Sequence, residues 1–240
     1  MEPMKPYKKN FDYSYTLGAF PTIELIKSRP ENVKCVYIHS SFTDTESINQ
    51  ICNSFNIQIL QNDKLFNRIS DKENCYVIGV FDKFECELEH DKPHIVLVNP
   101  SNMGNVGTII RTAVGLGIYD IACITPCADL FNPKTVRSSM GALFRMRHEY
   151  FESFEEYRKR YEKHDVFTFM LNGSNTFEIQ NCPKSELFSL VFGNEATGLD
   201  DSYLNVGTSI IIPQSPDVDS LNITIAVGIG AFVFMHQGKE

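Results

Sequence analysis

From residue 94 onward the chain alternates short apolar runs with segments whose apolar residues recur at helical spacing. Residues 95–98 form a continuous apolar run, as in a strand that is covered on both faces. The segment that follows places Val106, Ile109 and Ala113 on one helical stripe. This alternation predicts a largely parallel α/β sheet with helices on both sides. Further strands are predicted at residues 120–125, 166–171, 187–192 and 209–212, and further helices at 133–144, 154–163 and 221–236.

The first part of the chain, residues 17–84, carries a separate and shorter alternation of helical and extended signals, which predicts a small α/β unit. Residues 85–93 are rich in Glu, Asp, Lys and His and poor in side chains that fill a core, which indicates a linker or an exposed loop. We therefore expect two domains, at residues 1–88 and 89–240. Strands are predicted in the first at residues 33–39, 57–60 and 75–81, and a helix at 46–55.

The composition is that of a globular protein, with 42% hydrophobic and 22% charged residues. A net charge of −8 opposes broad binding to nucleic acid, because phosphates repel a negative protein at long range. One local stretch differs, since residues 134–148 contain several cations and no acid before Glu149. From charge alone, this stretch fits a solvated basic face and an RNA-binding surface equally. Its cationic residues are Lys134, Arg137, Arg145, Arg147 and His148.

The ends of the chain carry no membrane signal. Residues 1–16 lack the apolar core of a signal peptide, and the apolar run at 221–235 is interrupted by polar residues and too short for a membrane span. We expect a cytoplasmic protein that does not bind membranes. Its seven cysteines have no framework spacing, which indicates reduced thiols. Cys123 and Cys127 lack the second pair that a zinc site needs, so no metal is expected.

Three separated loops carry small and amide residues directly after predicted strands, so we expect them to converge at one sheet edge. They lie at residues 102–107, 192–199 and 212–222. Gly104 and Gly107 allow a ligand to approach the backbone, and the helix after them presents unpaired amide donors. The spacing is not G-x-G-x-x-G, and the lysine of a P-loop is missing. The loops thus predict a ligand pocket without support for a dinucleotide or a triphosphate.

The order of these motifs resembles the SPOUT-class RNA ribose methyltransferases, in their TrmH/SpoU branch. The first motif is Asn105 with Gly107 and Arg111, and the second is Gly193-Asn194-Glu195 with Gly198-Leu199. The third is Ile212-Pro213 with Ser220-Leu221-Asn222, and a further match covers Asn132-Pro133-Lys134 and residues 137–144. The sequence departs from the family pattern at Ala196, Pro216 and Thr224, which affects the expected loop shape more than the expected chemical groups.

The resemblance implies a C-terminal domain with a trefoil knot, in which the methyl donor S-adenosylmethionine lies among the second and third loops. General rules of chain topology would not propose a knot. The N-terminal unit looks like the ribosomal-protein-like RNA substrate domain that precedes such catalytic domains, and a purely structural small domain is the alternative. By the family pattern, the residues expected to bind the donor are Asn172, Gly193, Ile212 and Leu221.

The resemblance also implies catalytic roles for Arg111, Asn105, Glu195 and Asn222. Arginine stays protonated far above neutral pH, so Arg111 either removes a proton from the ribose 2′-hydroxyl or, in the chemically easier role, stabilises negative charge on that oxygen. Glu195 either adds a favourable field near the sulfonium or bonds to loop amides. Asn105 and Asn222 either touch the substrate or brace the loops.

The expected activity is S-adenosylmethionine-dependent methylation of a ribose 2′-hydroxyl in rRNA or tRNA, by a homodimer whose contact includes the apolar segment 221–235. Lys134, Arg137 and Arg145 are expected to hold RNA phosphates, and Ser139 to contact the target nucleotide. Two alternatives stay open. One is a non-catalytic RNA-binding or assembly protein on the same fold, and the other is a dinucleotide-dependent oxidoreductase, which only the glycine-rich turn favours.

Overall fold

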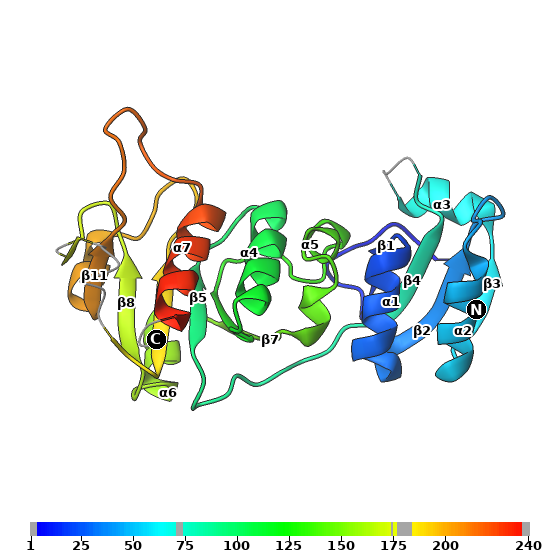
Figure 1. Ribbon diagram of the computed structural model, residues 1–240, viewed down its shortest axis with the longest axis horizontal. Helices are drawn as coiled ribbons and strands as arrows, with labels where there is room; N and C mark the ends of the chain where they lie inside the picture. Colours follow the sequence, from blue (N-terminus) through cyan, green and yellow to red (C-terminus); the bar gives the residue numbers. More distant parts are fainter. Residues whose placement is uncertain (1–3, 71–73, 174, 177–183, 237–240) are drawn as a thin grey trace. The chain divides into compact units, whose positions relative to one another are not determined.

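The computed structural model describes residues 4–70, 74–173, 175–176 and 184–236, and the chain divides into two compact units (Figure 1). Unit 1 contains Met1–Phe84 and Asp129–Arg145, and unit 2 contains Glu85–Ala128 and Met146–Glu240. The division after residue 84 lies four residues before the predicted boundary. Segment 129–145, which the sequence placed in the C-terminal domain, belongs to the first unit by its contacts.

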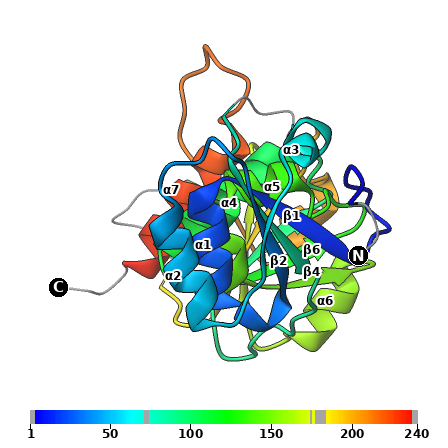
Figure 2. The same cartoon turned by 90° about the vertical axis from the view of Figure 1, so that its right-hand side faces the viewer.

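Unit 1 is built on a four-stranded sheet in the order β1-β4-β2-β3, in which β4 runs antiparallel to both of its neighbours. Helices α1 and α2 cover one face of this sheet (Figure 2), and α3 covers the other. The strands are β1 (Tyr13–Leu17), β2 (Val33–Ile38), β3 (Ile59–Gln61) and β4 (Val77–Asp82). The helices are α1 (Ala19–Ser28), α2 (Thr45–Ser54), α3 (Asp63–Ile69) and the 3-10 turn η1 (Pro30–Asn32).

Segment 129–145 joins unit 1 through aromatic burial and a few hydrogen bonds. It contains α5 (Pro133–Ser138) and the 3-10 turn η2 (Ala142–Arg145), which replace the single helix predicted at 133–144. The ring of Phe144 meets the edge of the buried Phe81 ring at 5.2 Å. The guanidinium Nε of Arg29 donates to the Phe144 carbonyl at 3.2 Å. Burial of these large apolar rings explains why the segment packs on the N-terminal sheet.

Unit 2 contains a sheet of seven parallel strands in the order β7-β6-β5-β10-β8-β11-β9, which confirms the predicted parallel α/β architecture. The strand β7 was not predicted, because its polar residues had been assigned to the basic stretch. The strands are β5 (His94–Val98), β6 (Asp120–Ile124), β7 (Arg147–Phe151), β8 (Asp165–Phe169), β9 (Asn175–Thr176), β10 (Phe188–Phe192) and β11 (Thr208–Ile211).

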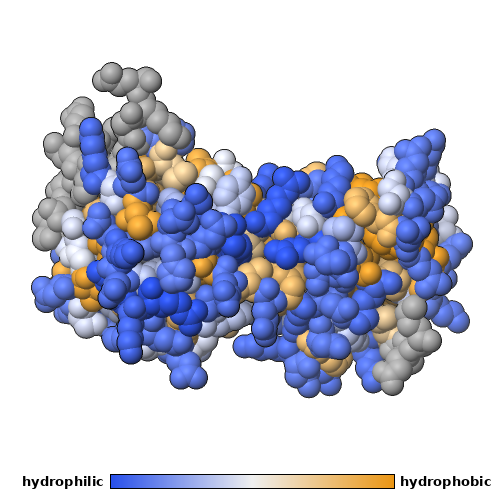
Figure 3. Space-filling model, turned by 90° about the horizontal axis from the view of Figure 1, so that it is seen from below, coloured by the Kyte–Doolittle hydropathy of each residue, from blue (hydrophilic) through white to orange (hydrophobic). Residues whose placement is uncertain are grey.

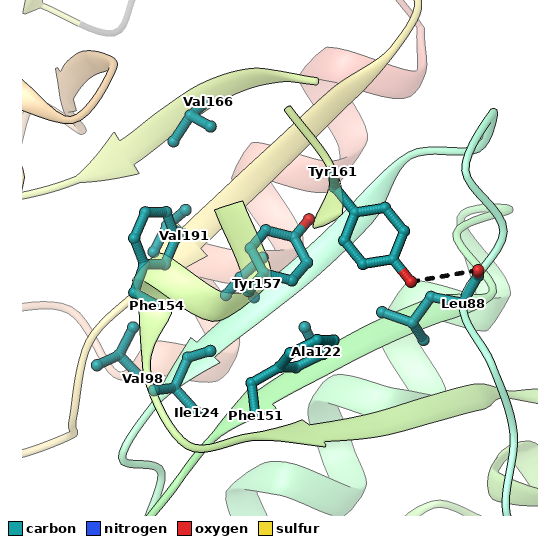
Figure 4. Packing of buried hydrophobic residues seen from close by; sticks show 11 residues of the cluster. Leu88, Val98, Ala122, Ile124, Phe151, Phe154, Tyr157, Tyr161, Val166 and Val191 are labelled. Carbon is teal, nitrogen blue, oxygen red and sulfur yellow. Dashed lines mark hydrogen bonds between the residues drawn. The ribbon is translucent and has the colours of Figure 1, made fainter. Parts of the chain in front are cut away.

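Helices cover both faces of this sheet. On one face α4 (Met103–Gly115) and α7 (Ile223–Met235) pack against each other, and the Phe234 ring contacts that of Phe167 at 4.6 Å. On the other face α6 (Phe154–Arg160) buries Phe154 and Tyr157 against side chains of β5, β6 and β10 (Figure 4). Alternate residues of each strand thus face opposite helix layers. A 3-10 turn, η4 (Asp201–Asn205), precedes β11.

The face drawn in Figure 3 is mainly hydrophilic, with apolar side chains in small patches. Within the described residues, none of the helices has the length and hydropathy needed to span a membrane. The six cysteines that the structure describes are free thiols, as the sequence predicts. The seventh, Cys182, lies outside the described residues.

A buried polar network joins the amino-terminal ends of the central strands to α6. The Nδ1 atom of His94 lies 2.9 Å from the Tyr157 hydroxyl, which lies 2.5 Å from the hydroxyl of Ser189. The same serine lies 2.9 Å from Nδ1 of His164. Burial, together with the neighbouring His164, lowers the pKa of His94 to about 4. The network therefore holds His94 neutral in the folded protein.

We expect this network to make folding sensitive to acid. The folded pKa lies below the unfolded value of about 6.5, so the contribution of His94 is complete above pH 6.5 and is lost as the pH falls toward 4. That difference corresponds to about 3 kcal/mol in the free energy of unfolding. Urea unfolding at a series of pH values should show this loss in the wild type and much less of it in His94→Asn. The control is His39→Asn, at a half-buried histidine of unit 1, which should leave the loss of stability in acid unaltered. The account would be contradicted if His94→Asn lost as much stability in acid as the wild type.

Candidate functional site

The candidate site lies at the carboxyl ends of the central strands of unit 2. After β5 the chain continues to β6 on one side, whereas β10 pairs with β5 on the other side. Where a parallel sheet changes direction in this way, the loops separate and leave a crevice that typically binds ligands. The three loops singled out in the sequence leave this part of the sheet.

A pocket of about 260 Å³ opens between the second and third loops and the end of β8. The four residues predicted to bind the methyl donor all line it, namely Asn172, Gly193, Ile212 and Leu221. Apolar walls come from β8, β10 and β11, and the polar groups from the loops. Asn172 donates to a carboxylate oxygen of Asp201 at 3.0 Å, which connects two sides of the pocket. The structure thus brings this predicted set together.

The loop after β10 folds back so tightly that Gly193 has no room for a side chain. A Cβ atom at this position would lie 2.1 Å from the carbonyl carbon of Gly198. Residues Asn194 and Gly198 form a backbone bridge, and Gly198 has a φ of +68°. Both glycines are therefore required by backbone geometry. Both glycines line the pocket together with Glu195.

Glu195 connects the second loop to the first. Its carboxylate accepts hydrogen bonds from the Ser101 amide at 3.0 Å, the Ser101 hydroxyl at 2.9 Å and the Asn102 amide at 3.0 Å. The side-chain amide of Asn105 donates to it at 3.3 Å. Partial burial would raise the pKa of Glu195, but the hydrogen bonds from these backbone amides outweigh it and lower the pKa below its ordinary value. Glu195 is therefore an ionised clamp at the start of α4, where the helix dipole also favours negative charge.

Asparagine side chains fix the shape of the loops. Asn102 caps α4, since its Oδ1 atom accepts from the amides of Gly104 and Asn105 at 2.8 and 3.1 Å. Asn194 donates to the Asn99 carbonyl at 2.7 Å. Asn222 caps α7 by accepting from the Thr224 amide at 2.8 Å. Asn105 and Asn222 thus brace loops, one of the two roles left open by the sequence.

Sequence analysis placed Asn102 and Asn194 in the converging loops without giving either side chain a role, and it missed Ser101. A signal existed for Asn102, because an asparagine directly before an apolar helical stripe is a preferred N-cap. The bonds of Ser101 and Asn194 join residues more than 90 positions apart, and nothing in local spacing encodes them.

Arg111 does not line the pocket of its own chain. It is exposed on α4, whose buried stripe includes Ile109, Ile110 and Ala113. Arg111 is six positions after Asn105, which places it about 9 Å further along the helix axis. Its neighbour Thr112 faces Gly228 of α7. The structure therefore gathers Asn105 and Glu195 but leaves Arg111 outside this group.

The four predicted RNA contacts all lie in unit 1. Lys134 and Arg137 are exposed on α5. Arg145 forms an ion pair with Glu24 at 2.6 Å. Ser139 is buried and donates to the Val136 carbonyl at 2.7 Å, so its predicted contact with RNA would require that bond to open.

The basic stretch is not a uniform basic face, as one interpretation of the sequence had it. Arg147 forms an ion pair with the buried Asp120 at 2.5 Å, and His148 is buried. These two residues belong to unit 2 and serve its sheet. Only Lys134 and Arg137 of the stretch are exposed cations for which the described residues show no ion pair.

Comparison with known proteins agrees with the sequence motifs. The model of the SpoU rRNA Methylase family matches residues 92–232. An uncharacterized tRNA/rRNA methyltransferase of Synechocystis is 30% identical over 149 residues, which cover 62% of this chain and 54% of that protein. The 23S rRNA (guanosine(2553)-2′-O)-methyltransferase RlmP of Bacillus subtilis is 33% identical over 127 residues, which cover 52% of this chain and 51% of that protein. The chain spans about half the length of these curated relatives.

The fold is shared with solved structures. An AdoMet-bound rRNA methyltransferase from Sinorhizobium meliloti matches with a TM-score of 0.79 at 24% sequence identity. The match covers 95% of this chain and 88% of that one. At this identity the likeness concerns the fold, an α/β architecture with a parallel sheet and helices.

We expect the Glu195 clamp to control the order of the first loop. In Glu195→Gln, the neutral amide oxygen replaces a carboxylate that accepts several charge-assisted hydrogen bonds. Hydrogen exchange of the Ser101 and Asn102 amides should speed up by roughly 10-fold or more, while exchange in the strands of unit 2 stays unchanged. Glu186→Gln, at an exposed glutamate, is the matched control. Unchanged exchange at Ser101 and Asn102 would show that the clamp does not order this loop.

Proposed function

The chain belongs to the SpoU rRNA Methylase family, and we propose that it transfers a methyl group from S-adenosylmethionine (AdoMet) to a ribose 2′-hydroxyl of an rRNA or a tRNA. The observation that carries the proposal is the pocket at the carboxyl edge of unit 2. Its walls contain every residue that the family pattern assigns to the donor, and the Glu195 clamp fixes one of its loops to α4. The similar B. subtilis protein is named as a 2′-O-methyltransferase of 23S rRNA.

The residues of the pocket suit a sulfonium donor. Two carboxylates, Glu195 and Asp201, are among the lining residues that the structure describes, and no lysine or arginine is. A cation is therefore favoured over an anion such as a dinucleotide phosphate. Phe169, Phe192 and Leu199 offer apolar walls for an adenine ring. We propose that Asn172, Gly193, Ile212 and Leu221 hold the donor, mainly through backbone groups, and that no metal takes part.

When bound, the donor would supply an electrophilic methyl group to the ribose oxygen. The methyl–sulfur bond would break as the new C–O bond forms, and the hydroxyl proton would pass to water. We assign Arg111 the stabilisation of negative charge on that oxygen and the binding of an adjacent phosphate, because a guanidinium stays protonated at neutral pH. Glu195, which its hydrogen bonds keep ionised, contributes a favourable field near the sulfonium and holds the first loop in place. Asn105 and Asn222 act as positioning residues through Glu195 and the cap of α7.

Arg111 stands outside the pocket of its own chain, and a homodimer would resolve this separation. Helix α7 packs against α4, the helix of Arg111, and carries two large apolar side chains on its exposed surface. Ile225 is 53% exposed and Phe232 is 52% exposed. Exposed apolar side chains along one helix are typical of a subunit contact. We propose that two copies pair through this face and that Arg111 of one copy serves the pocket of the other.

Three further features belong to the proposal. The segment from β11 through α7 forms the trefoil knot of the SPOUT fold. The part of the chain before residue 89, together with segment 129–145 that packs on it, is the RNA substrate domain, and the rest of residues 89–240 is the catalytic domain. Lys134, Arg137 and Arg145 hold RNA phosphates. The protein works in the cytoplasm, where its RNA substrates are found.

The direct test of the activity uses Arg111→Ala. We expect methyl transfer from labelled AdoMet to total RNA, extracted from cells that lack this chain, to fall by 100-fold or more. The affinity for AdoMet should stay within about 3-fold, since Arg111 does not line the pocket. Arg68→Ala, at an exposed arginine of unit 1, should keep full activity. If the wild type binds RNA but transfers no methyl group, the non-catalytic alternative replaces the proposed enzyme.

The proposed dimer is tested by Ile225→Glu combined with Phe232→Glu. Two buried, unpaired carboxylates would disfavour the subunit contact, so we expect sedimentation to change from dimer to monomer. Methyl transfer should fall with the dimer, while AdoMet binding persists. Tyr119→Glu, at a side chain that is 42% exposed, is the control. A wild-type chain that sediments as a fully active monomer would exclude this arrangement.

A further inference from the structure

Unit 1 contains a second pocket, of about 270 Å³, and Arg137 is the one described lining residue that already has a proposed role. It opens where β1 passes into α1, at residues 17–21, and its other walls come from residues 74–77 and from the end of α5. Every lining residue belongs to unit 1, including Arg137 and Met140 of segment 129–145. The inserted segment therefore completes this pocket.

Aromatic side chains form one wall of the pocket. Phe20 lies in the first turn of α1 and is 53% exposed, although an apolar ring of that size is normally buried. Phe42 and Tyr76 are half-buried beside it. The Tyr76 hydroxyl donates to Asn74 at 3.1 Å, which fixes the phenol ring. Exposed rings of this kind are the usual platform for stacking of nucleobases.

Positive charge surrounds the same opening. Helix α1 begins at Gly18 without a side-chain cap and without an acidic residue in its first turn, so the positive end of its dipole is not neutralised locally. Arg137 lines the pocket, and Lys134 is exposed one turn earlier on α5. None of the described lining residues is an aspartate or a glutamate. In a protein of net charge −8, this is a local site for an anion.

The backbone around the pocket adopts conformations that side chains rarely take. Gly18 has a φ of +118°, Asn74 of +64° and Met140 of +50°. The left-handed region is unfavourable for a methionine, and such strain concentrates at functional sites. The apolar side chain of Met140 is 40% exposed and lines the pocket. The polarisable Met140 thioether thus adds to the surface against which a flat base can pack.

We propose that this pocket binds one unpaired nucleotide of the RNA substrate, with the base against Phe20 and its neighbours and the phosphate on Arg137 and the start of α1. The inference rests on the proposed function, because it makes unit 1 the part that selects an RNA for methylation in unit 2. A nucleotide is the ligand that combines a flat aromatic face with an anion. A protein segment without acidic or phosphorylated side chains would use the aromatic side chains but not the paired cation and helix terminus.

The test measures RNA binding without any methyl donor. The probes are rRNA and tRNA extracted from cells that lack this chain, and a fluorescein-labelled single-stranded RNA 12-mer of mixed sequence. We expect Phe20→Ala to weaken binding of the RNAs that the wild type binds by about 10-fold, as loss of one stacked base does. Phe20→Tyr should restore most of the affinity. Phe55→Ala, at a phenylalanine of unit 1 that is 44% exposed outside the pocket, should bind as the wild type does.

A second variant distinguishes the contact with the phosphate from the contact with the base. Arg137→Ala should weaken binding and reduce the slope of log affinity against log salt by about 1, whereas Phe20→Ala should leave that slope unchanged. The AdoMet affinity of both variants should stay within about 2-fold of the wild type, and an unchanged circular dichroism spectrum reports that unit 1 is still folded. Wild-type RNA affinity in both variants, or a wild type that binds none of the probes, overturns the inference.

The outcome also distinguishes the inference from the proposed function. If Phe20→Ala loses RNA affinity and the wild type transfers no methyl group, the nucleotide pocket stands and the proposed enzyme fails. If the wild type transfers methyl groups and Phe20→Ala binds and methylates RNA equally well, the enzyme stands and the nucleotide pocket fails.

Discussion

The site depends on one ionised carboxylate. Glu195 follows β10, and its partners Ser101 and Asn102 follow β5, so its hydrogen bonds connect the loops of two adjacent parallel strands. The loop after β10 is also held by its own tight turn at Gly193, by Asn194 and by the packing of Leu199 against the core. The same charge stabilises the start of α4, so helix and loop are positioned by a single group. A carboxylate used in this way cannot serve as a proton donor at neutral pH.

The loops that Glu195 connects form the walls of the pocket, and most of the described side chains that line it are uncharged. The carboxyl ends of parallel strands provide the opening, and tight turns keep the backbone close to whatever binds there. Among the residues that the structure describes, the charged ones that line it are acidic. The cation expected to act on RNA, Arg111, lies on the exposed side of α4. Within one chain, the proposed donor pocket and Arg111 thus lie on different surfaces, and the proposed dimer would bring Arg111 of one copy to the pocket of the other.

The sequence predicted the parts of this design that are encoded locally. The parallel sheet of unit 2 follows from apolar runs alternating with helical stripes. The pocket-lining residues Gly193, Ile212 and Leu221 were named through the family resemblance of their motifs. Long-range pairing was not predictable. The burial of Phe144 against Phe81, which carries segment 129–145 into unit 1, depends on tertiary packing that no short pattern contains. For the same reason Arg147 looked like a free cation, although it pairs with the buried Asp120.

The most direct test of this account is to follow hydrogen exchange of every backbone amide of the wild-type chain during titration with AdoMet. We expect AdoMet to slow exchange in residues 193–199 and 212–222 and at the end of β8, the three walls of the pocket in unit 2, with unit 1 unchanged. Protection confined to other parts of the chain, or none at saturating AdoMet, would contradict the claim that these loops form the donor site.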